Sequence, residues 1–518
     1  MAFKEDTETA ITSTSLEAGV LDDKPPNENI IDWDGPQDPE NPHNWPGRKR
    51  WAHVIVVALI SLVMYLQSFP NKTTLLLTLL TRNMAPTMCA PGINEILSTF
   101  NIQSSTISTL AVTLYVLGLA MGPMFMSSLS EVFGRLPVYH LANLFFVAFV
   151  IGNALSQNIA TFMICRFISG CAGGTPMALG GGTIADVTTI QQRAVAMSLY
   201  SLGPMAGPVL GPLIGGFVAS NLTWRWTFYL LAIFSGTIGL ASLLVMRETH
   251  PKIILERKAA RLRKATGDPH LRSKLSDPKP APQLLLQALT RPTKLLFRSP
   301  ILLIISIYMA LIFGLMYLLF TTFTDVFETQ YGFSTATSGL VYLGLGVSLV
   351  TCMFIAKPLG ERLTAYHSAK KADDGTQQQH RAEYRLLPMI YFSPCVAIGL
   401  FIYGWTVYYK VHWIVPIIGT SVIGFGSFFV MMSAQLYLID LFGSSASASA
   451  LAANNVLRFI CSTFLPLAGP AMYRSLGYGW GNTLLGFLAL GFLPAPVVFY
   501  RYGGWMHARM GGGIDPCK

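Results

Sequence analysis

The stretch SLGPMAGPVLGPLIGGFV, from Ser201 to Val218, decides how this chain can fold. It is apolar enough to cross a membrane, yet it places glycine and proline, the residues least suited to a helix interior, at four-residue spacing. The glycines are Gly203, Gly207, Gly211, Gly215 and Gly216, and the prolines are Pro204, Pro208 and Pro212. Four residues advance a helix by slightly more than one turn, so the glycines form a groove along one face and the prolines a ridge beside it.

Each proline in this stretch takes a backbone donor away from the carbonyl four residues earlier, which frees the carbonyls of Tyr200, Pro204 and Pro208. Lipid cannot satisfy these carbonyls, so they must face other helices or a water-filled cavity. The pattern therefore predicts a helix at an interface between helix bundles. A close-packed, kinked helix is the alternative, but it explains the glycines and not three prolines in register.

The rest of the chain has the composition of a membrane protein. Of its 518 residues, 52% are hydrophobic and only 12% are charged, whereas a soluble protein carries roughly 25% charged residues. Apolar runs of about 20 residues recur along the chain, and a polar segment at 248–299 divides them six and six. The predicted spans lie near 51–80, 106–127, 137–156, 160–184, 195–219, 224–246, 300–323, 336–357, 388–408, 412–437, 446–470 and 480–500.

The net charge of +10 reflects topology rather than a nucleic-acid surface. With the N-terminus placed inside, the inner segments hold 29 of the 36 Lys and Arg residues, and the outer segments hold only Lys72, Arg82, Arg225, Lys410 and Arg474. The positive-inside rule then places both termini in the cytoplasm, and the inner basic residues face anionic lipid.

These observations divide the chain into five parts. We expect a disordered cytoplasmic arm at 1–50, six-helix bundles at 51–247 and 300–501, a cytoplasmic loop at 248–299 and a tail at 502–518. The loop begins with Ile253, Ile254, Leu255 and Leu262 among basic residues, a pattern that suits either a helix at the lipid headgroups or a solvated linker.

The first span is irregular, because QSFPNK interrupts it and the stretch from Trp51 to Ala90 is 40 residues long. One helix needs only about 20 residues to cross a bilayer. A broken helix, a short re-entrant piece and an insert at 67–83 that is foreign to the mature protein are all open interpretations.

The loop SSLSEVFGRLPVYH, Ser127 to His140, resembles the loop between spans two and three of the major facilitator superfamily. Glu131 stands at the acidic position, and Gly134 and Arg135 match. A tight turn at Gly134 would let an acid and a guanidinium dock on neighbouring helices in one state and separate in another. The alternative is a positive-inside anchor with a helix-ending glycine. Asp186, after the fourth span, can cap the next helix or pair with Arg135 or Arg193.

Two arginines lie within predicted spans, Arg166 in CRFISGCAGGTP and Arg458 in NNVLRFI. An arginine in hydrocarbon faces protein or water and is a functional candidate by default. Arg166 either has such a role or only satisfies helix carbonyls, and it resembles the Arg-x-x-x-Gly motif of the superfamily's fourth span, which implies proton coupling. Arg458 instead suggests cavity polarity. The candidate cavity residues are Tyr115, Tyr200, Gln435, Asn454, Asn455 and Arg458.

The wider resemblance covers nearly all of the chain after residue 30 and points to the fungal twelve-span drug:proton antiporter branch of the superfamily. It is carried by DWDGPQDPENPHNW, APGINEI, GRLPVYH, GGGTIAD, NLTWRWTFY, RETHP, YGFSTATSGLVYLG, EYRL, YLID, SASALAANNVLRF and LGYGW. GPVLGPLIGG also matches the antiporter signature of span five, found in exporters. The resemblance implies an all-α membrane protein, with twelve transmembrane helices in two pseudo-symmetric six-helix bundles, that exports drugs, polyamines or secondary metabolites in exchange for protons.

The function expected from these features is proton-coupled efflux of a small hydrophobic or amphiphilic compound by a monomer in the cell membrane. No secure carboxylate lies in the middle of a span, so proton coupling falls by elimination on Arg166 and the group of Glu131, Arg135 and Asp186. A proton symporter that imports a nutrient or polyamine is the alternative. The scattered histidines and cysteines predict no enzyme, metal site or cofactor.

Overall fold

The computed structural model describes residues 30–35, 37–62, 85, 87–275, 281–372 and 382–510, and these residues are almost entirely helical. The first half contains α1 (Gly47–Leu62), α4 (Ile93–Thr99), α5 (Ser105–Phe133), α6 (Arg135–Ala154), α7 (Ile159–Gly173), α8 (Thr175–Val187), α9 (Ile190–Asn221) and α10 (Trp224–Val245). The second half contains α13 (Pro300–Tyr331), α14 (Thr335–Leu340), α15 (Leu343–Ala372), α16 (Leu387–Phe392), α17 (Pro394–Tyr408), α18 (Ile414–Phe464), α19 (Gly469–Gly491) and α20 (Pro494–Met510).

The segment between the two halves contains α11 (Pro251–Thr266) and α12 (Ala281–Arg298). The remaining elements are two short strands, β1 (Ile30–Ile31) and β2 (Arg272–Ser273), and the 3-10 helices η1 (Pro42–Asn44), η2 (Ala382–Leu386) and η3 (Leu465–Ala468).

Eleven of the predicted spans coincide with helical segments, and the first does so over its described part, 51–62. In the described ranges, nine segments are long and apolar enough to cross a membrane, and α1 and α9 account for the first and fifth predicted spans. The last of the nine, Ser449–Tyr502, contains two passes, because Gly477 (φ 71°) interrupts α19. Gly443 (φ 59°) divides α18 in the same way. Residues 63–80 of the first span, and the possible insert at 67–83, lie outside the described residues.

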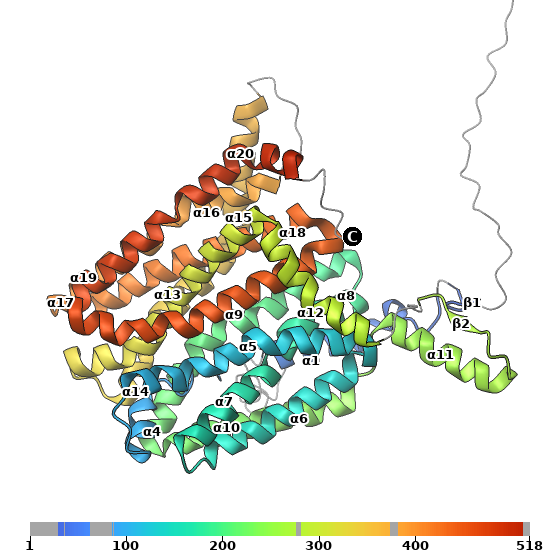
Figure 1. Cartoon of the computed structure of the whole chain (residues 1–518), viewed down its shortest axis with the longest axis horizontal. Coiled ribbons are helices and arrows are strands. Elements are labelled where there is room, and N and C mark those ends of the chain that lie inside the picture. Colours follow the sequence, from blue (N-terminus) through green and yellow to red (C-terminus); the bar gives the residue numbers. More distant parts are fainter. Residues whose placement is uncertain are drawn as a thin grey trace, which may run out of the picture.

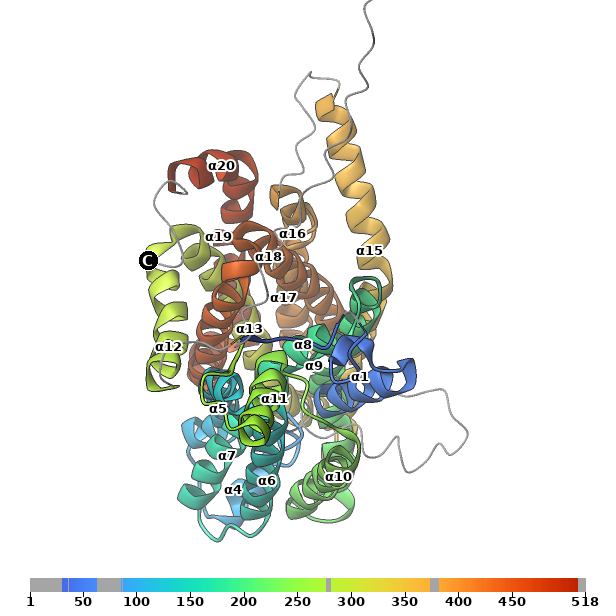
Figure 2. The ribbon, with the colours of Figure 1, turned by 90° about the vertical axis from the view of Figure 1, so that its right-hand side faces the viewer.

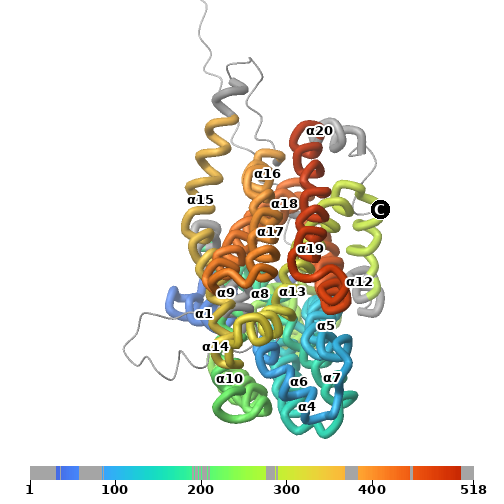
Figure 3. The backbone as a smooth tube through the Cα atoms, turned by 90° about the vertical axis from the view of Figure 1, so that its left-hand side faces the viewer, coloured from blue at the N-terminus to red at the C-terminus, as the bar shows by residue number. Residues whose placement is uncertain are grey.

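The helices form two bundles, one from each half of the chain (Figure 1). The bundles touch along two seams, where α5 packs against α18 and where α9 packs against α14 and α15. One apolar core runs through both bundles and includes Tyr115 from α5 and Tyr317 from α13. Helix α15 projects beyond its bundle, as the turned views show (Figures 2 and 3). Helix α12 packs against α5 and α18 and so contacts both bundles.

The described part of the N-terminal segment is ordered, in contrast to the disordered arm expected over 1–50. Strand β1 pairs in parallel with β2, with Ile30 opposite Arg272. Asp38 is buried and accepts hydrogen bonds from the backbone N–H groups of Asp34 and Glu40, both at 2.8 Å. The ammonium of Lys258 on α11 reaches the Asp38 carboxylate at 3.2 Å. Residues 1–29 lie outside the description.

We call this contact between the acidic segment 32–40 and α11 the N-terminal clasp, and it lies beside the bundles (Figure 1). Helix α11 is the basic helix expected after RETHP, but Leu255 and Ala259 on it are buried against protein rather than left for lipid. Three more ion pairs hold the clasp, Lys258 to Asp34 at 2.8 Å, Lys274 to Asp32 at 2.5 Å and Arg261 to Glu40 at 3.4 Å. The acidic residues of the segment therefore dock on basic residues of the central loop.

Candidate functional site

Helix α9 carries the glycine and proline series and runs unbroken from Ile190 to Asn221. At its far end it touches α14 through backbone atoms. A Cβ added at Gly216 would lie 2.8 Å from the carbonyl oxygen of Thr335, and a Cβ at Gly339 of α14 would lie 2.6 Å from that of Pro212. Only glycine permits this approach, so the expected groove serves a contact between bundles.

The other residues of the series have varied surroundings. A Cβ at Gly215 would strike the carbonyl oxygen of Met88, in the same bundle. Gly207 and Gly211 are buried. The surroundings of Gly203, Pro204 and Pro208 lie outside the described part of the structure.

Hydrogen bonds also join the bundles near α14, and we call this end of the molecule the α14 end. Asn94, before α5, donates to Glu328 of α13 at 3.1 Å, and Arg474 of α19 donates to Ser105 at 3.3 Å. Along the seam between α5 and α18, the hydroxyl of Thr463 donates to the carbonyl oxygen of Thr113 at 3.5 Å. These contacts join the two bundles through side chains that can exchange partners.

The opposite end carries α11 and most of the basic residues, and we call it the basic end. Here Arg135 Nε forms an ion pair with Asp186 Oδ2 at 2.5 Å, and each side chain is 15% exposed. Arg135 lies across Gly182, so the pair links the start of α6 to the end of α8. Of the two roles considered for Asp186, the structure therefore shows pairing with Arg135. Glu131 is exposed and makes no ion pair with any described residue.

Glu248, which the sequence analysis did not single out, completes this site. Its carboxylate accepts hydrogen bonds from the backbone N–H groups of Arg135 at 3.0 Å and Leu136 at 3.3 Å, at the start of α6. It also accepts from His250 at 3.0 Å, just before α11. Gly134 (φ 98°) makes the turn, and a Cβ there would lie 2.9 Å from the carboxyl carbon of Glu248. A carboxylate at a helix start is favoured by the unpaired N–H groups.

The second bundle repeats the arginine and aspartate pair. Arg385 of η2 pairs with Asp440 at 2.9 Å, near the break at Gly443 in α18, and these side chains are 50% and 37% exposed. The two pairs occupy corresponding positions, before the third helix and at the end of the fourth in each bundle. Both charged residues stand in stretches that carry the family resemblance, EYRL and YLID. Their contact could not be predicted from the sequence, because they lie 55 positions apart.

Arg166 is fully buried, and protein atoms accept its hydrogen bonds. Its guanidinium donates to the carbonyl oxygens of Ala111 at 3.1 Å, Val112 at 3.2 Å and Ala85 at 2.8 Å, and to Cys89 Sγ at 3.1 Å. The ring of Tyr115 lies 5.1 Å away. This arginine thus ties α7 to α5, to Ala85 and to Cys89. The geometry is that of the alternative in which Arg166 only satisfies helix carbonyls.

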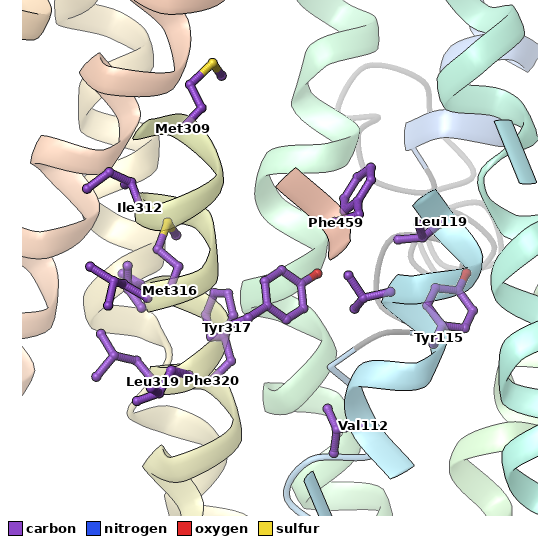
Figure 4. Packing of buried hydrophobic residues seen from close by; sticks show 14 of the residues in the cluster. Val112, Tyr115, Leu119, Met309, Ile312, Met316, Tyr317, Leu319, Phe320 and Phe459 are labelled. Carbon is purple, nitrogen blue, oxygen red and sulfur yellow. The ribbon is translucent and has the colours of Figure 1, made fainter. Parts of the chain in front are cut away.

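Arg458 is also buried, at 6% exposure, but its surroundings differ. The guanidinium lies between the rings of Phe313 at 4.6 Å and Phe459 at 4.8 Å. Its Nε has no hydrogen-bond partner among the described residues, and the same holds for both amide atoms of Asn454. Tyr317, one turn from Phe313 on α13, points its hydroxyl toward α5 (Figure 4). We call Asn454, Arg458, Tyr317, Phe313 and Phe459 the Arg458 cluster.

The remaining cavity candidates do not all join this cluster. Tyr200 donates to the carbonyl oxygens of Pro176 at 3.0 Å and Met177 at 3.2 Å, where α8 begins. Tyr115 packs with its hydroxyl against Gly173. Gln435 and Asn455 are half-buried on α18. No group of three or more His, Cys, Asp or Glu side chains that could hold a metal ion occurs in the described ranges.

Comparison with known proteins places this architecture in a family. Residues 73–466 match the Major Facilitator Superfamily. The MFS transporter prlG of a fungal species (strain NRRL 50135) is 48% identical, and the match covers 93% of this chain and 97% of that protein. The Trichosetin biosynthesis cluster MFS transporter of Gibberella fujikuroi is 43% identical over 93% of this chain and 90% of that protein.

The fold has relatives among solved structures too. The xylose transporter XylE from E. coli, in a partially occluded inward open conformation, superposes with a TM-score of 0.59 at 16% identity, over 88% of this chain and 98% of that chain. The chain therefore belongs to the Major Facilitator Superfamily, within its fungal transporters, and has that all-α membrane fold. It is a multi-pass membrane transporter rather than an enzyme.

Proposed function

We propose that this transporter exports a small hydrophobic or amphiphilic organic compound, of the secondary-metabolite type, in exchange for protons, working as a monomer in the cell membrane. The observation that carries the proposal is the contact between α9 and α14 at Gly216 and Gly339. The helix with the exporter-like glycine and proline series forms the seam that must open and close if the bundles alternate. A relative named for a biosynthesis cluster adds support for a metabolite cargo.

The orientation follows from charge. Most Lys and Arg residues lie at the basic end, so this end faces the cytoplasm with both termini and the α14 end faces outside. In the described conformation the outer side is then closed by contacts such as Asn94 with Glu328. Alternating access requires these contacts to break while new ones form at the basic end.

Proton coupling is assigned to the group that contains Arg166, Arg135, Asp186 and Glu131. Arginine does not lose its proton in proteins, so the carboxylate must take it up. Asp186 is the carboxylate that holds a cation, and its protonation would release Arg135 and loosen α6 from α8. Glu131 is exposed and could serve as the acid nearest to the cytoplasm. Arg166 fixes α5 and α7 relative to Ala85 and Cys89 during the movement.

The accumulation of fluorescent dyes in cells tests the direction of transport. Cells that lack their own efflux pumps and express this chain are loaded with rhodamine 6G, Nile red or pyrenebutyrate, which are cationic, neutral and anionic. We expect at least one dye to reach a lower steady level than in cells with an empty vector, and an uncoupler to abolish the difference. A higher level of every transported dye would instead indicate import by symport and contradict the proposal.

A further inference from the structure

The two buried arginines differ in what surrounds their charge. Protein carbonyls and a thiol accept the hydrogen bonds of Arg166. Arg458 has no described carboxylate within 4.0 Å, and its buried Nε has no described acceptor. A buried charge that is neither paired nor hydrogen-bonded is costly, because the medium around it has a low dielectric constant. Arg458 is therefore a cation whose counterion does not come from the described protein.

The aromatic rings near Arg458 do not remove this need. Phe313 and Phe459 lie 4.6 and 4.8 Å from the guanidinium carbon and attract it through their faces. Phenyl rings accept no strong hydrogen bond, so the N–H groups still need an acceptor. The rings supply instead an apolar wall on which the hydrophobic body of a ligand can pack.

Other polar groups near Arg458 are also unpaired. Asn454 lies one helical turn before it, on the same face of α18, is completely buried and has no described partner for either amide atom. On the facing side of the seam, the hydroxyl of Thr113 is buried without a described partner. Tyr317 extends its hydroxyl from α13 toward α5, into the same region between the bundles (Figure 4).

We propose that the Arg458 cluster binds the negatively charged group of an amphiphilic organic anion, such as a carboxylate, sulfonate or enolate. Guanidinium binds two oxygens of such a group side by side, and the Asn454 amide and the Tyr317 hydroxyl add donors. Phe313 and Phe459 pack on the apolar part. This assignment names the substrate class and rests on the proposed transport function.

The place of the cluster also suits a transported ligand. Thr463, which bonds to Thr113 across the seam, follows Arg458 by little more than one turn of α18. A ligand on Arg458 therefore lies next to a contact between the bundles, where both bundles can sense its arrival. An anion would offset the buried positive charge, so its binding would favour whichever arrangement of the bundles holds it more tightly.

Binding by the purified transporter in neutral-lipid nanodiscs tests the assignment without any transport step. The probes are pyrenebutyrate, decanoate and indole-3-acetate, each compared with its own primary amide, which keeps the apolar body and removes the charge. We expect at least one acid to bind about tenfold or more tightly than its amide, since hydrogen bonds to charged groups are the strong ones. Equal affinity of acid and amide in all three pairs would overturn the proposal.

Variants test whether Arg458 causes the preference for the acid over its amide. Arg458→Gln should abolish the preference for the acid, and Arg458→Lys should keep part of it. Arg501→Gln removes the same charge from an exposed position on α20 and should leave the preference unchanged. Retention of the preference in Arg458→Gln would overturn the proposal, as would competition by chloride alone at the same site without any effect of the organic anions.

Thermal unfolding separates ligand binding from a structural role. Removing an uncompensated buried charge should leave the unfolding temperature of Arg458→Gln unchanged or raise it. A lower unfolding temperature together with an intact acid preference would show that Arg458 only supports the fold.

If the vesicles described below move cationic or neutral cargo with protons but no acid preference is found, export stands and the anion site fails. If anions bind but no cargo moves, the anion site stands and the export proposal fails.

Discussion

At the scale of the residue, Gly134 shows how one backbone position organises the basic end. Its positive φ reverses the chain between α5 and α6, and the missing side chain leaves room for the Glu248 carboxylate on the first N–H groups of α6. Arg135 then begins the helix beside Asp186. The turn, the helix start and the ion pair thus depend on the same few atoms.

Alanine substitutions test this dependence. Gly267 also has a positive φ but nothing within 4 Å of an added Cβ, so Gly267→Ala measures the backbone cost alone. We expect about 1 kcal/mol of destabilisation at Gly267 and about 2 to 3 kcal/mol at Gly134, where the Cβ also displaces Glu248. Thermal unfolding in detergent gives both values. Equal losses at the two positions would show that Glu248 does not occupy the turn.

The two arginine and aspartate pairs provide a second comparison at this scale. The Arg135 and Asp186 side chains are each 15% exposed, whereas those of Arg385 and Asp440 are 50% and 37% exposed. Asp186→Asn should cost about 1 to 2 kcal/mol and Asp440→Asn less than about 0.5 kcal/mol, because solvent screens the exposed pair. The unfolding temperatures of the two variants measure these losses of stability. A larger loss for Asp440→Asn than for Asp186→Asn would contradict the expectation that the more buried pair contributes more.

At the scale of the element, helix α9 forms a contact between the bundles that can open and close when the bundles move. Its residue Gly216 meets α14 at the α14 end, where the backbones are separated by no side chain. A helix that is held by backbone contact rather than by interlocking side chains can separate and return without repacking a core. The same property makes the contact sensitive to any added side chain.

Gly216→Leu should therefore prevent the α14 end from closing and abolish transport, while the protein still inserts into the membrane. Gly236→Leu on α10 is the matched control, because nothing lies within 4 Å of its Cβ, and it should retain transport. Dye accumulation in cells and membrane abundance on immunoblots are the measurements. Full activity of Gly216→Leu at normal abundance would contradict the role of this contact.

The N-terminal clasp predicts a pH dependence at the same scale. The Lys274 ammonium and the Trp33 backbone N–H lower the pKa of Asp32. Burial by itself would raise the pKa of Asp38, but the N–H groups of Asp34 and Glu40 and the Lys258 ammonium outweigh it and lower that pKa as well. A lowered carboxyl pKa gives stabilisation that is present above the ordinary carboxyl pKa and is lost as pH falls through the lowered value.

Hydrogen exchange at residues 30–45, corrected for the intrinsic rate, should thus show protection at pH 7 that declines as the medium is acidified below pH 4. Asp38→Asn should reduce protection at pH 7. Asp34 also pairs with Lys258, but its side chain is 78% exposed and solvent screens the pair, so Asp34→Asn is the comparison variant and should have a smaller effect. Protection that is unchanged at low pH and in Asp38→Asn would show that these carboxylates do not hold the clasp.

At the scale of the whole molecule, the spacing of the apolar runs predicted the membrane helices of the described ranges and their division into two bundles, because the bilayer imposes length and apolarity on each span. The glycine and proline series predicted an interface helix, and Gly216 lies in that interface. Order at 30–50 was not predicted, because the acidic segment is stabilised by Lys258 and Lys274 over 200 residues away. The unpaired state of Arg458 could not be foreseen either, since it depends on which neighbours the fold brings near.

The central claim is that the outward movement of cargo is coupled to the inward movement of protons. Its direct test is an inside-out vesicle that contains the purified chain and a trapped pH indicator, with an acidic interior and the cargo added outside. We predict cargo uptake accompanied by proton exit, abolished in Gly216→Leu and uncoupled from the gradient in Asp186→Asn. Cargo uptake with no change of internal pH, or with proton entry, would contradict the account.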